Sequence, residues 1–396
     1  MNYIGLDLGT GAIKAVLWNK EKGILERISE RVEFSRPAPG FVEMDPDAYL
    51  EQFMKIVKTL AAASGKEISG IAFAAASGNT LLCDQEGNAL TPIISWLDTR
   101  LGDEFFPPES WEVRKTTGWP ALKTFPLMHL EYFKRKAPAL LAGSIVAMNN
   151  DFLTWQLCGN HLLDFSNAAP FYLVEQATGK LAPYVKEYYN LSENQLPEIV
   201  PPGTFAGYLK EKWQGGNLTS NTRIHCGSFD HPAGARAAGI TSPGELLLSC
   251  GTSWVGFYPA AKREDIPASD LCDVFQSSCG GCWGGMFSLA KVGVEVEAFT
   301  VERFGNIPER YRLFNEEAMD RKSASFARMK EVIFRFKEKF DLHGPFTRIV
   351  ISGGPSEGAA WKKYTEEFLD VPVKSSPYLS YTGAAGSAIM ASGDVK

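Results

Sequence analysis

The chain has 396 residues, of which 45% are hydrophobic and 22% charged, and its formal net charge is -6 at pH 7. The length favours two domains, the composition is that of an ordinary globular protein, and the negative charge argues against binding to nucleic acid or to an anionic membrane. No apolar run reaches the length of a membrane span, and the first strand is expected from residue 3, so we expect neither a signal peptide nor a membrane anchor. The odd number of cysteines, seven, then predicts reduced thiols and a cytoplasmic location.

One group of cysteines is a candidate zinc site. Cys272, Cys279 and Cys282 lie close together in the sequence, but no second C-x-x-C pair and no spaced pair of histidines supplies a fourth ligand. Burial of these side chains as small hydrophobes is therefore favoured.

The first predicted element is a β-hairpin over residues 3–18. Apolar residues alternate on both sides of Gly9-Thr10-Gly11, where glycines permit a tight turn and let an anion such as a phosphate reach backbone N–H groups. Lys14 adds a cation beyond the turn, and Asp7 ends the first strand, where a carboxylate can hold a hydrated divalent ion. An ordinary hairpin with a glycine turn fits these residues equally well.

The rest of the N-terminal half alternates strands with helices. Asp45 and Pro46 predict the N-cap and first position of a helix that carries an apolar stripe to Leu60. Residues 104–145 are expected to be mostly helical, and residues 160–222 rich in loops. The further predicted elements are strands over residues 23–34, 68–75, 81–83, 92–96, 145–148 and 225–228, and helices that end at Leu157 and cover residues 232–239.

A second hairpin is predicted over residues 245–258. Its turn, Gly251-Thr252-Ser253, repeats the Gly-Thr turn of the first hairpin. Two such turns in separate halves of a chain indicate a duplicated fold, in which each half offers one turn to the same polyphosphate.

The C-terminal part is predicted to hold a long helix over residues 316–340 and a strand over 348–352. Gly353-Gly354 then forms a turn before the helix 359–369, and such a turn lets a ribose or a flat ring pack against the backbone. A simple tight connection is the alternative. The last helix, from Gly383, consists of small residues that allow close packing.

Taken together, these residues resemble the FGGY family of carbohydrate kinases, within the superfamily of actin, Hsp70 and sugar kinases. The likeness rests on ordered motifs that extend over most of the chain. They are Asp7-Leu8-Gly9-Thr10 with Lys14, Trp96-Leu97-Asp98-Thr99-Arg100, Asp164-Phe165-Ser166-Asn167-Ala168, Gly227-Ser228-Phe229-Asp230-His231, Gly251-Thr252-Ser253 and Ser352-Gly353-Gly354.

The chain also departs from the family pattern. The segment Gly118-Trp119-Pro120-Ala121-Leu122-Lys123 begins like a family signature, but Pro126 stands where a Trp is usual. A segment of the C-terminal half is missing near residues 305–314, and Ser77-Gly78-Asn79 replaces the Gln-Met-His of typical xylulokinases. The Ser-Gly and the short chain are more like the small ribulose-kinase-type members.

The resemblance implies an α/β protein with two ribonuclease H-like (actin-like ATPase) domains and a central cleft, divided as residues 1–239 and 240–396. It implies transfer of the γ-phosphoryl group of ATP, with Mg²⁺, to a hydroxyl of a small sugar or polyol, such as the ketopentoses ribulose or xylulose. Asp230 would be the base and Asp7 would act on the metal. The remaining expected contacts are Gly9, Thr10, Gly11, Lys14, Gly251, Thr252, Gly353 and Gly354 with ATP, and Ser77, Asn79, Trp96 and Asp98 with the sugar.

Several alternatives stay open from the sequence. Asp230 could be a helix N-cap, Lys14 a solvated surface lysine and Trp96 a core residue. The whole chain could be a sugar-independent ATPase of the same superfamily or a pseudokinase that binds sugar without turnover. The expected partner is a small molecule rather than nucleic acid or membrane, and a homodimer is left open.

Overall fold

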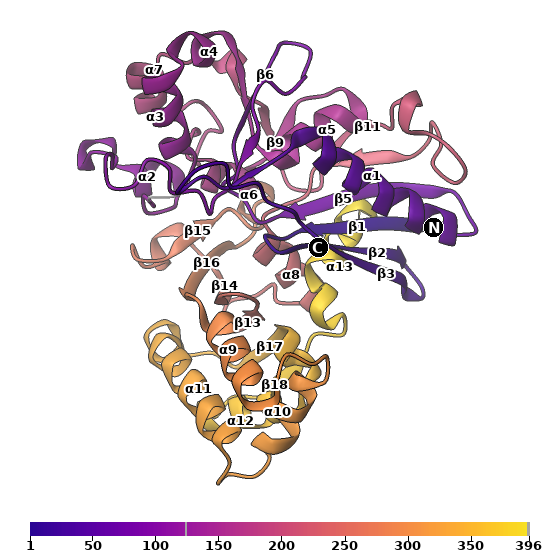
Figure 1. The fold of residues 1–396 in the computed structure, drawn as a ribbon, viewed down its shortest axis with the longest axis vertical. Helices are drawn as coiled ribbons and strands as arrows, with labels where there is room; N and C mark the ends of the chain where they lie inside the picture. Colours follow the sequence, from indigo (N-terminus) through magenta and orange to yellow (C-terminus); the bar gives the residue numbers. More distant parts are fainter. Residues whose placement is uncertain (123–124, 394–396) are drawn as a thin grey trace. The chain divides into compact units, whose positions relative to one another are not determined.

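The computed structural model describes residues 1–122 and 125–393, and of Cys279 the backbone alone. Its first sheet is organised around the N-terminal hairpin (Figure 1). Its strand order is β11-β12-β5-β1-β2-β3. The three N-terminal strands are antiparallel, whereas β5 and β12 run parallel to β1. The bounds are β1 Asn2–Leu8, β2 Ala12–Asn19, β3 Gly23–Arg31, β5 Ile68–Ala75, β11 Phe205–Tyr208 and β12 Arg223–His225. The predicted hairpin and its third strand are confirmed.

The second sheet repeats this arrangement. Its strands β16-β14-β13-β17-β18 again join an antiparallel meander to parallel strands. They are β13 Glu245–Cys250, β14 Trp254–Ala260, β16 Trp283–Leu289, β17 Arg348–Gly353 and β18 Val373–Ser375. The second predicted hairpin and the duplicated fold are therefore confirmed.

The chain divides into two compact units. Unit 1 contains residues 1–233, 271–274 and those from Gly383 onward, and unit 2 contains residues 234–270 and 275–382. Besides the first sheet, unit 1 has short strands, β4 Glu43–Met44, β6 Leu81–Cys83, β7 Ile93–Ile94, β8 Ile145–Ala147, β9 Leu162–Asp164, β10 Glu198–Val200 and β15 Leu271–Asp273. Its helices are α1 Pro46–Ala63, α2 Val113–Thr117, α3 Pro126–Lys136, α4 Pro138–Gly143, α5 Asn149–Cys158, α6 Phe165–Phe171, α7 Pro183–Tyr189 and most of α13 Thr382–Ala391.

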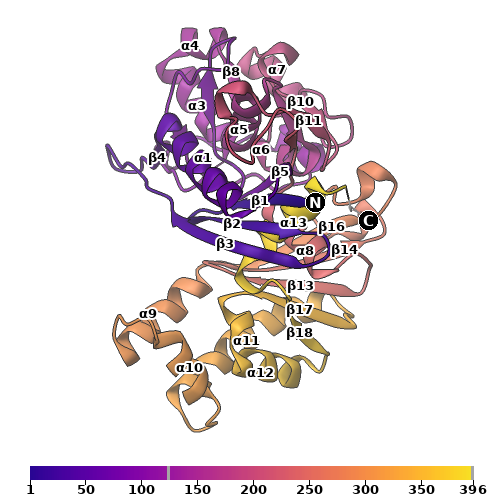
Figure 2. The same cartoon turned by 90° about the vertical axis from the view of Figure 1, so that its right-hand side faces the viewer.

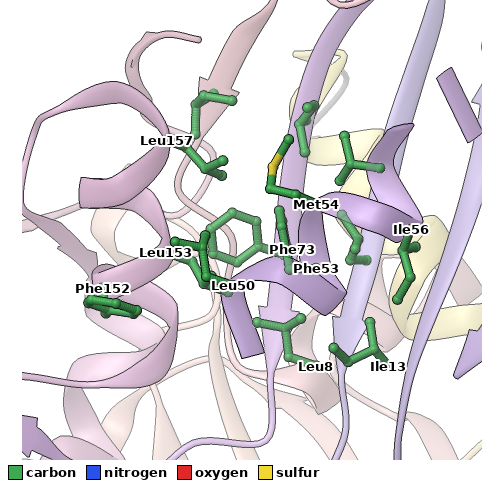
Figure 3. Close-up of a cluster of buried hydrophobic side chains, with 14 of the residues drawn as sticks. Leu8, Ile13, Leu50, Phe53, Met54, Ile56, Phe73, Phe152, Leu153 and Leu157 are labelled. Atoms are coloured by element: carbon green, nitrogen blue, oxygen red, sulfur yellow. The ribbon is translucent and has the colours of Figure 1, made fainter. Parts of the chain in front are cut away.

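The core of unit 1 lies between its sheet and the helices α1 and α5. Asp45 caps α1 by accepting a hydrogen bond from the Ala48 N–H at 2.9 Å, as the sequence predicts. Figure 3 shows side chains of both helices converging on strand residues such as Leu8 and Phe73. Successive strand residues point to opposite faces, so Gly5 faces the other side of β1, where α13 lies (Figure 2). A Cβ at Gly5 would stand 2.0 Å from the Ala384 carbonyl oxygen, so the close packing predicted for the last helix is confirmed.

Unit 2 covers its sheet with helices from the C-terminal half. These are α9 Val292–Phe304, α10 Arg310–Ala318, α11 Ala324–His343 and α12 Ala359–Leu369. Figure 2 shows α11 and α12 against β17 and β18, and their apolar faces form one core with the strands. The helix α8 Asp230–Ala238 contains the boundary between the units.

Two predicted elements were wrong. The long helix over residues 316–340 is two helices, because residues 319–323 form turns and Ser323 begins α11 as its N-cap, accepting from the Phe326 N–H at 3.0 Å. The strand expected over residues 225–228 is β12, which ends at His225. The following residues lie beside β5, where Ala75 and Phe229 form an isolated bridge.

The expected division into residues 1–239 and 240–396 differs from the compact units. The C-terminal helix returns to unit 1, because its small residues fit against Gly5 and because a Cβ at Gly386 would meet the Ala233 carbonyl oxygen at 2.0 Å. As a boundary between family domains, the division stays a prediction. Lys123 lies outside the described residues. No helix in the described part of the chain is both long and apolar enough to cross a bilayer.

Candidate active site

Two carboxylates meet at one edge of the first sheet. Asp7 is next to last in β1, and Asp230 is the first residue of α8, which follows the segment beside β5. That segment runs very close to β5, since a Cβ at Gly227 would stand 1.9 Å from the Phe73 carbonyl oxygen. The ends of the parallel strands thereby bring together the residues predicted to hold the metal and to act as base.

The environment of the two carboxylates raises the pKa of both above the ordinary value for aspartate. Burial raises the pKa of Asp7, and the negative charge of Asp230 raises it further, although Lys14, its cross-strand neighbour, lowers it. Burial also raises the pKa of Asp230, while the His231 backbone N–H, which donates to Asp230 Oδ1 at 2.8 Å, lowers it. Burial lowers the pKa of His231 to about 4, so its ring is neutral at pH 7.

Asp7 has an unused acceptor that suits a hydrated cation. Its Oδ1 atom is buried and has no hydrogen-bond partner among the described residues. Among the side chains that the structure describes, which exclude that of Cys279, no group of three or more His, Cys, Asp and Glu could hold a metal. Mg²⁺ usually takes only one or two carboxylates and keeps several waters, and Asp7 fits that chemistry.

The first Gly-Thr turn is connected to the predicted sugar side. The Trp96 indole Nε1–H donates to Thr10 Oγ1 at 2.9 Å, and the Trp96 backbone N–H donates to Asn79 Oδ1 at 3.0 Å. A Cβ at Gly11 would meet nothing within 4 Å, so the tip of the turn is open to a ligand. Since the Thr10 hydroxyl accepts from Trp96, its own proton remains to be donated elsewhere.

The other predicted sugar contacts are buried and paired. The Ser77 hydroxyl donates to Asn167 Oδ1, and Asn79 Nδ2 donates to Asn149 Oδ1 at 3.0 Å. Asp98, only 2% exposed, forms an ion pair with Arg100 at 2.8 Å and accepts from the Val42 N–H at 2.7 Å. Asp98 thus holds its own loop in place, and its expected contact with sugar stays a prediction.

Sequence reasoning missed an aromatic cluster beside Trp96. The ring of Phe125 lies 6.3 Å from that of Trp96, and Trp119 lies 5.8 Å from Phe125 and 5.3 Å from Phe229. Gly78 has φ +102°, and a Cβ there would stand 2.5 Å from the Phe125 ring, which explains the glycine between Ser77 and Asn79. Trp119 follows Gly118 in the recognised signature, but nothing in the spacing showed where its ring would point.

In unit 2, the predicted nucleotide residues surround one cavity of about 720 Å³. Gly251, Thr252 and Gly354 line it, and Gly353 holds the strands together behind it, since a Cβ there would stand 2.1 Å from the Cys250 carbonyl oxygen. Three further lining residues, Val294, Tyr311 and Met319, are 48%, 43% and 47% exposed. A glycine-rich polar end beside exposed apolar side chains suits a phosphate chain joined to a flat base.

Comparisons with known proteins agree on one family. The model of the FGGY family of carbohydrate kinases, N-terminal domain, matches residues 2–236. The xylulose kinase of Staphylococcus xylosus is 27% identical over 264 residues, which are 64% of this chain and 54% of that protein. The xylulose kinase of Klebsiella pneumoniae is 27% identical over 71% of this chain and 59% of its own length. The chain therefore spans little more than half the length of these relatives.

Solved structures show the fold over nearly the whole chain. The xylulose kinase of Rhodospirillum rubrum has a TM-score of 0.81 at 20% identity and matches 99% of this chain and 90% of that one. Glycerol kinase of Plasmodium falciparum with ADP also has a TM-score of 0.81, at 16% identity, over 100% of this chain and 90% of that one. The fold is thus that of the sugar kinases, with two ribonuclease H-like domains, as expected.

Proposed function

Because the chain belongs to the FGGY family of carbohydrate kinases, we propose that it transfers the γ-phosphoryl group of ATP to a hydroxyl of a small sugar or polyol. The observation that carries the proposal is the pair of buried carboxylates, Asp7 and Asp230, at the edge of the first sheet. Phosphoryl transfer needs positioning and charge neutralisation more than covalent help from the protein. Asp7, whose Oδ1 has no hydrogen-bond partner among the described residues, is available for a cation, and Asp230 is available for the attacking hydroxyl.

In this mechanism Asp230 accepts the proton of the acceptor hydroxyl as that oxygen bonds to the γ-phosphorus, and the bond to the bridging oxygen breaks so that ADP leaves. Its raised pKa makes it a better proton acceptor than an ordinary aspartate once it is ionised. Asp7 would hold a hydrated Mg²⁺, which would supply positive charge against the phosphates. The neutral His231 fixes Asp230 through its backbone N–H rather than by acting as a base itself.

ATP is assigned to the two glycine turns and the unit 2 cavity. The amides of Gly9 and Gly11 and the hydroxyl proton of Thr10 bind phosphate oxygens, and Lys14 adds a positive charge. Gly251 and Thr252 bind the phosphate chain from unit 2, while Gly353 and Gly354 support the nucleoside. The base packs on Val294, Tyr311 and Met319, whose exposure supports this assignment.

The acceptor is assigned to the residues around Trp96. Ser77 and Asn79 offer polar groups, and Trp96 with Phe125 offers an apolar wall. The names of the relatives favour a ketopentose such as xylulose, and ribulose is the second candidate. Use of ATP fits the predicted cytoplasmic location, and a homodimer stays open.

The proposal is tested by ADP release from the purified full chain with Mg²⁺-ATP and a panel of ketoses and polyols. We expect turnover that one class of sugar stimulates and that requires Asp230. Hydrolysis independent of every sugar would instead identify an ATPase. Saturable sugar binding without ADP release would identify a pseudokinase.

A further inference from the structure

One sequence motif lies outside the groups assigned to the reaction. Asp164-Phe165-Ser166-Asn167-Ala168 forms the start of α6, where Asp164 accepts from the Asn167 backbone N–H at 2.9 Å and from Asn167 Nδ2 at 2.7 Å. Asp164, Ser166 and Asn167 are all at most 2% exposed. Burying polar side chains costs free energy unless they are hydrogen-bonded, so the partners of these side chains indicate what the motif does.

Ser166 connects this motif to the segment that carries Asp230. Its Oγ accepts from the Phe229 backbone N–H at 3.1 Å and donates to Asp273 Oδ2 at 2.5 Å. Phe229 directly precedes Asp230, so this bond fixes the peptide at which α8 begins. Because the carboxylate takes the hydroxyl proton, the lone pairs of Oγ are turned toward the N–H.

Asp273 is itself held firmly within unit 1. It is 0% exposed, and its neighbour Cys272 donates its backbone N–H to the Gly118 carbonyl at 2.9 Å. The Cys272 carbonyl accepts from Gln176 Nε2 at 2.8 Å. The acceptor of the Ser166 hydroxyl is therefore anchored independently of α8.

The same motif also reaches the predicted sugar side. The adjacent Asn167 accepts the hydroxyl proton of Ser77. One short helix start thus fixes both the peptide before Asp230 and the segment that begins at Ser77.

We propose that Ser166, oriented by Asp273, is a positioning residue that sets the place of the Asp230 carboxylate relative to the acceptor hydroxyl. The inference rests on the proposed function, since it assumes that Asp230 is the base. A misplacement of about 1 Å costs on the order of 100-fold in rate, whereas substrate affinity depends on other contacts. Loss of the Ser166 hydroxyl therefore lowers kcat and leaves KM for ATP and sugar nearly unchanged.

The test compares Ser166→Ala with Ser325→Ala in the full chain. Ser325 is a matched control in unit 2, since it is also 0% exposed and donates to a carboxylate, that of Glu317, at 2.5 Å. We expect kcat of Ser166→Ala to fall by about 10- to 100-fold with both KM values within about twofold. Ser325→Ala should lose similar stability to urea and keep its kcat. Equal kcat values for the two variants would overturn the proposal.

Asp273 gives a second test should Ser166→Ala not fold. Asp273→Asn keeps an acceptor oxygen and should retain most of kcat, whereas Asp273→Ala should lose it. Equal losses in both would contradict the proposal.

If the unaltered chain shows no sugar-stimulated turnover, the proposed function fails. Crystal structures of the variants then test whether Ser166 positions Asp230. The Asp230 carboxylate must be displaced by about 1 Å relative to β5 in Ser166→Ala and must keep its place in Ser325→Ala.

Discussion

At the scale of single residues, Asp230 is the side chain on which the proposed chemistry depends most. Asp230→Asn keeps the size of the side chain but removes its basicity, so we expect kcat to fall by about 10²- to 10⁴-fold. Sugar binding, measured by calorimetry, should persist. Asp84→Asn, at a half-buried carboxylate that accepts from the Glu86 N–H in a turn, is the control and should leave kcat unchanged. Retained turnover in Asp230→Asn would exclude it as the base.

The raised pKa of Asp230 predicts the direction of the pH dependence. Burial makes this carboxyl hold its proton to higher pH than the ordinary value of about 4, and only the ionised form can accept a proton. The kcat/KM for the sugar should therefore rise with pH through an apparent pKa above that value. Asp7→Asn removes a neighbouring negative charge and should shift this limb to lower pH. A limb that stays in place would show that the two carboxylates do not interact.

For Trp96 we expect a substitution to lower the affinity for nucleotide rather than kcat. Trp96→Phe keeps an aromatic ring and removes the N–H that donates to Thr10, so the threonine hydroxyl loses the partner that orients it. We expect the Kd for Mg²⁺-ADP, measured without sugar, to rise by about 2- to 10-fold. Trp213→Phe is the matched control, because Trp213 Nε1 also donates one bond, to the Gln156 carbonyl at 3.0 Å. Equal Kd values for the two variants would show that the hydrogen bond from Trp96 to Thr10 does not affect nucleotide binding.

At the scale of elements, Gly353 joins two strands of the second sheet. Its φ of +86° with an extended ψ is accessible almost only to glycine, and a Cβ would collide with the backbone of Cys250. Gly353→Ala should lower the free energy of unfolding by about 2 kcal/mol or more. Gly354→Ala is the control for stability, because a Cβ there would meet nothing within 4 Å. Urea denaturation of both variants measures the difference, and equal midpoints would contradict this account.

The elements that the sequence predicted best are those coded by local pattern. Both Gly-Thr hairpins and the capped helix at Asp45 follow from alternation, turn residues and a cap within a few positions. The strand β16 was not predicted, because glycines weaken a strand pattern. In the structure Gly284 and Gly285 make room for the rings of Phe257 and Tyr258. The helix 316–340 was predicted as one element because its apolar residues keep a helical spacing across Ser323, which in the structure is the N-cap of α11.

The candidate site was predictable in its residue types but not in its partners. The motifs with Asp7 and Asp230 gave the chemistry, and the structure brings these residues together. No local pattern could show that Asp273, 107 positions from Ser166, would accept its proton. The ion pair of Asp98 with Arg100 was not predicted for a different reason. The two residues are close in the sequence, but the sequence does not show that their side chains are buried together.

At the scale of the whole molecule, the two units hold different parts of the proposed site. The cavity assigned to the nucleoside is built from unit 2 alone, and the hydrogen bonds of the sugar side all lie within unit 1. A ligand that binds the folded state slows local unfolding, by up to about 100-fold at a concentration of about 100 times its Kd. Each ligand should therefore leave its own pattern of protection.

Hydrogen exchange with mass spectrometry tests whether the nucleotide and the sugar protect different units. Mg²⁺-ADP alone should protect the Gly251-Thr252 turn, α10 and residues 353–361, whereas sugar alone should protect residues 77–79 and 96–100 and leave α10 unchanged. Peptides from α7, whose residues Pro183–Tyr189 take no part in the assigned sites, serve as the control. Protection of α10 by sugar alone would place the acceptor in the unit 2 cavity. Nucleotide protection confined to unit 1 would leave that cavity without its proposed ligand, and the assignment of Val294, Tyr311 and Met319 to the base would then be wrong.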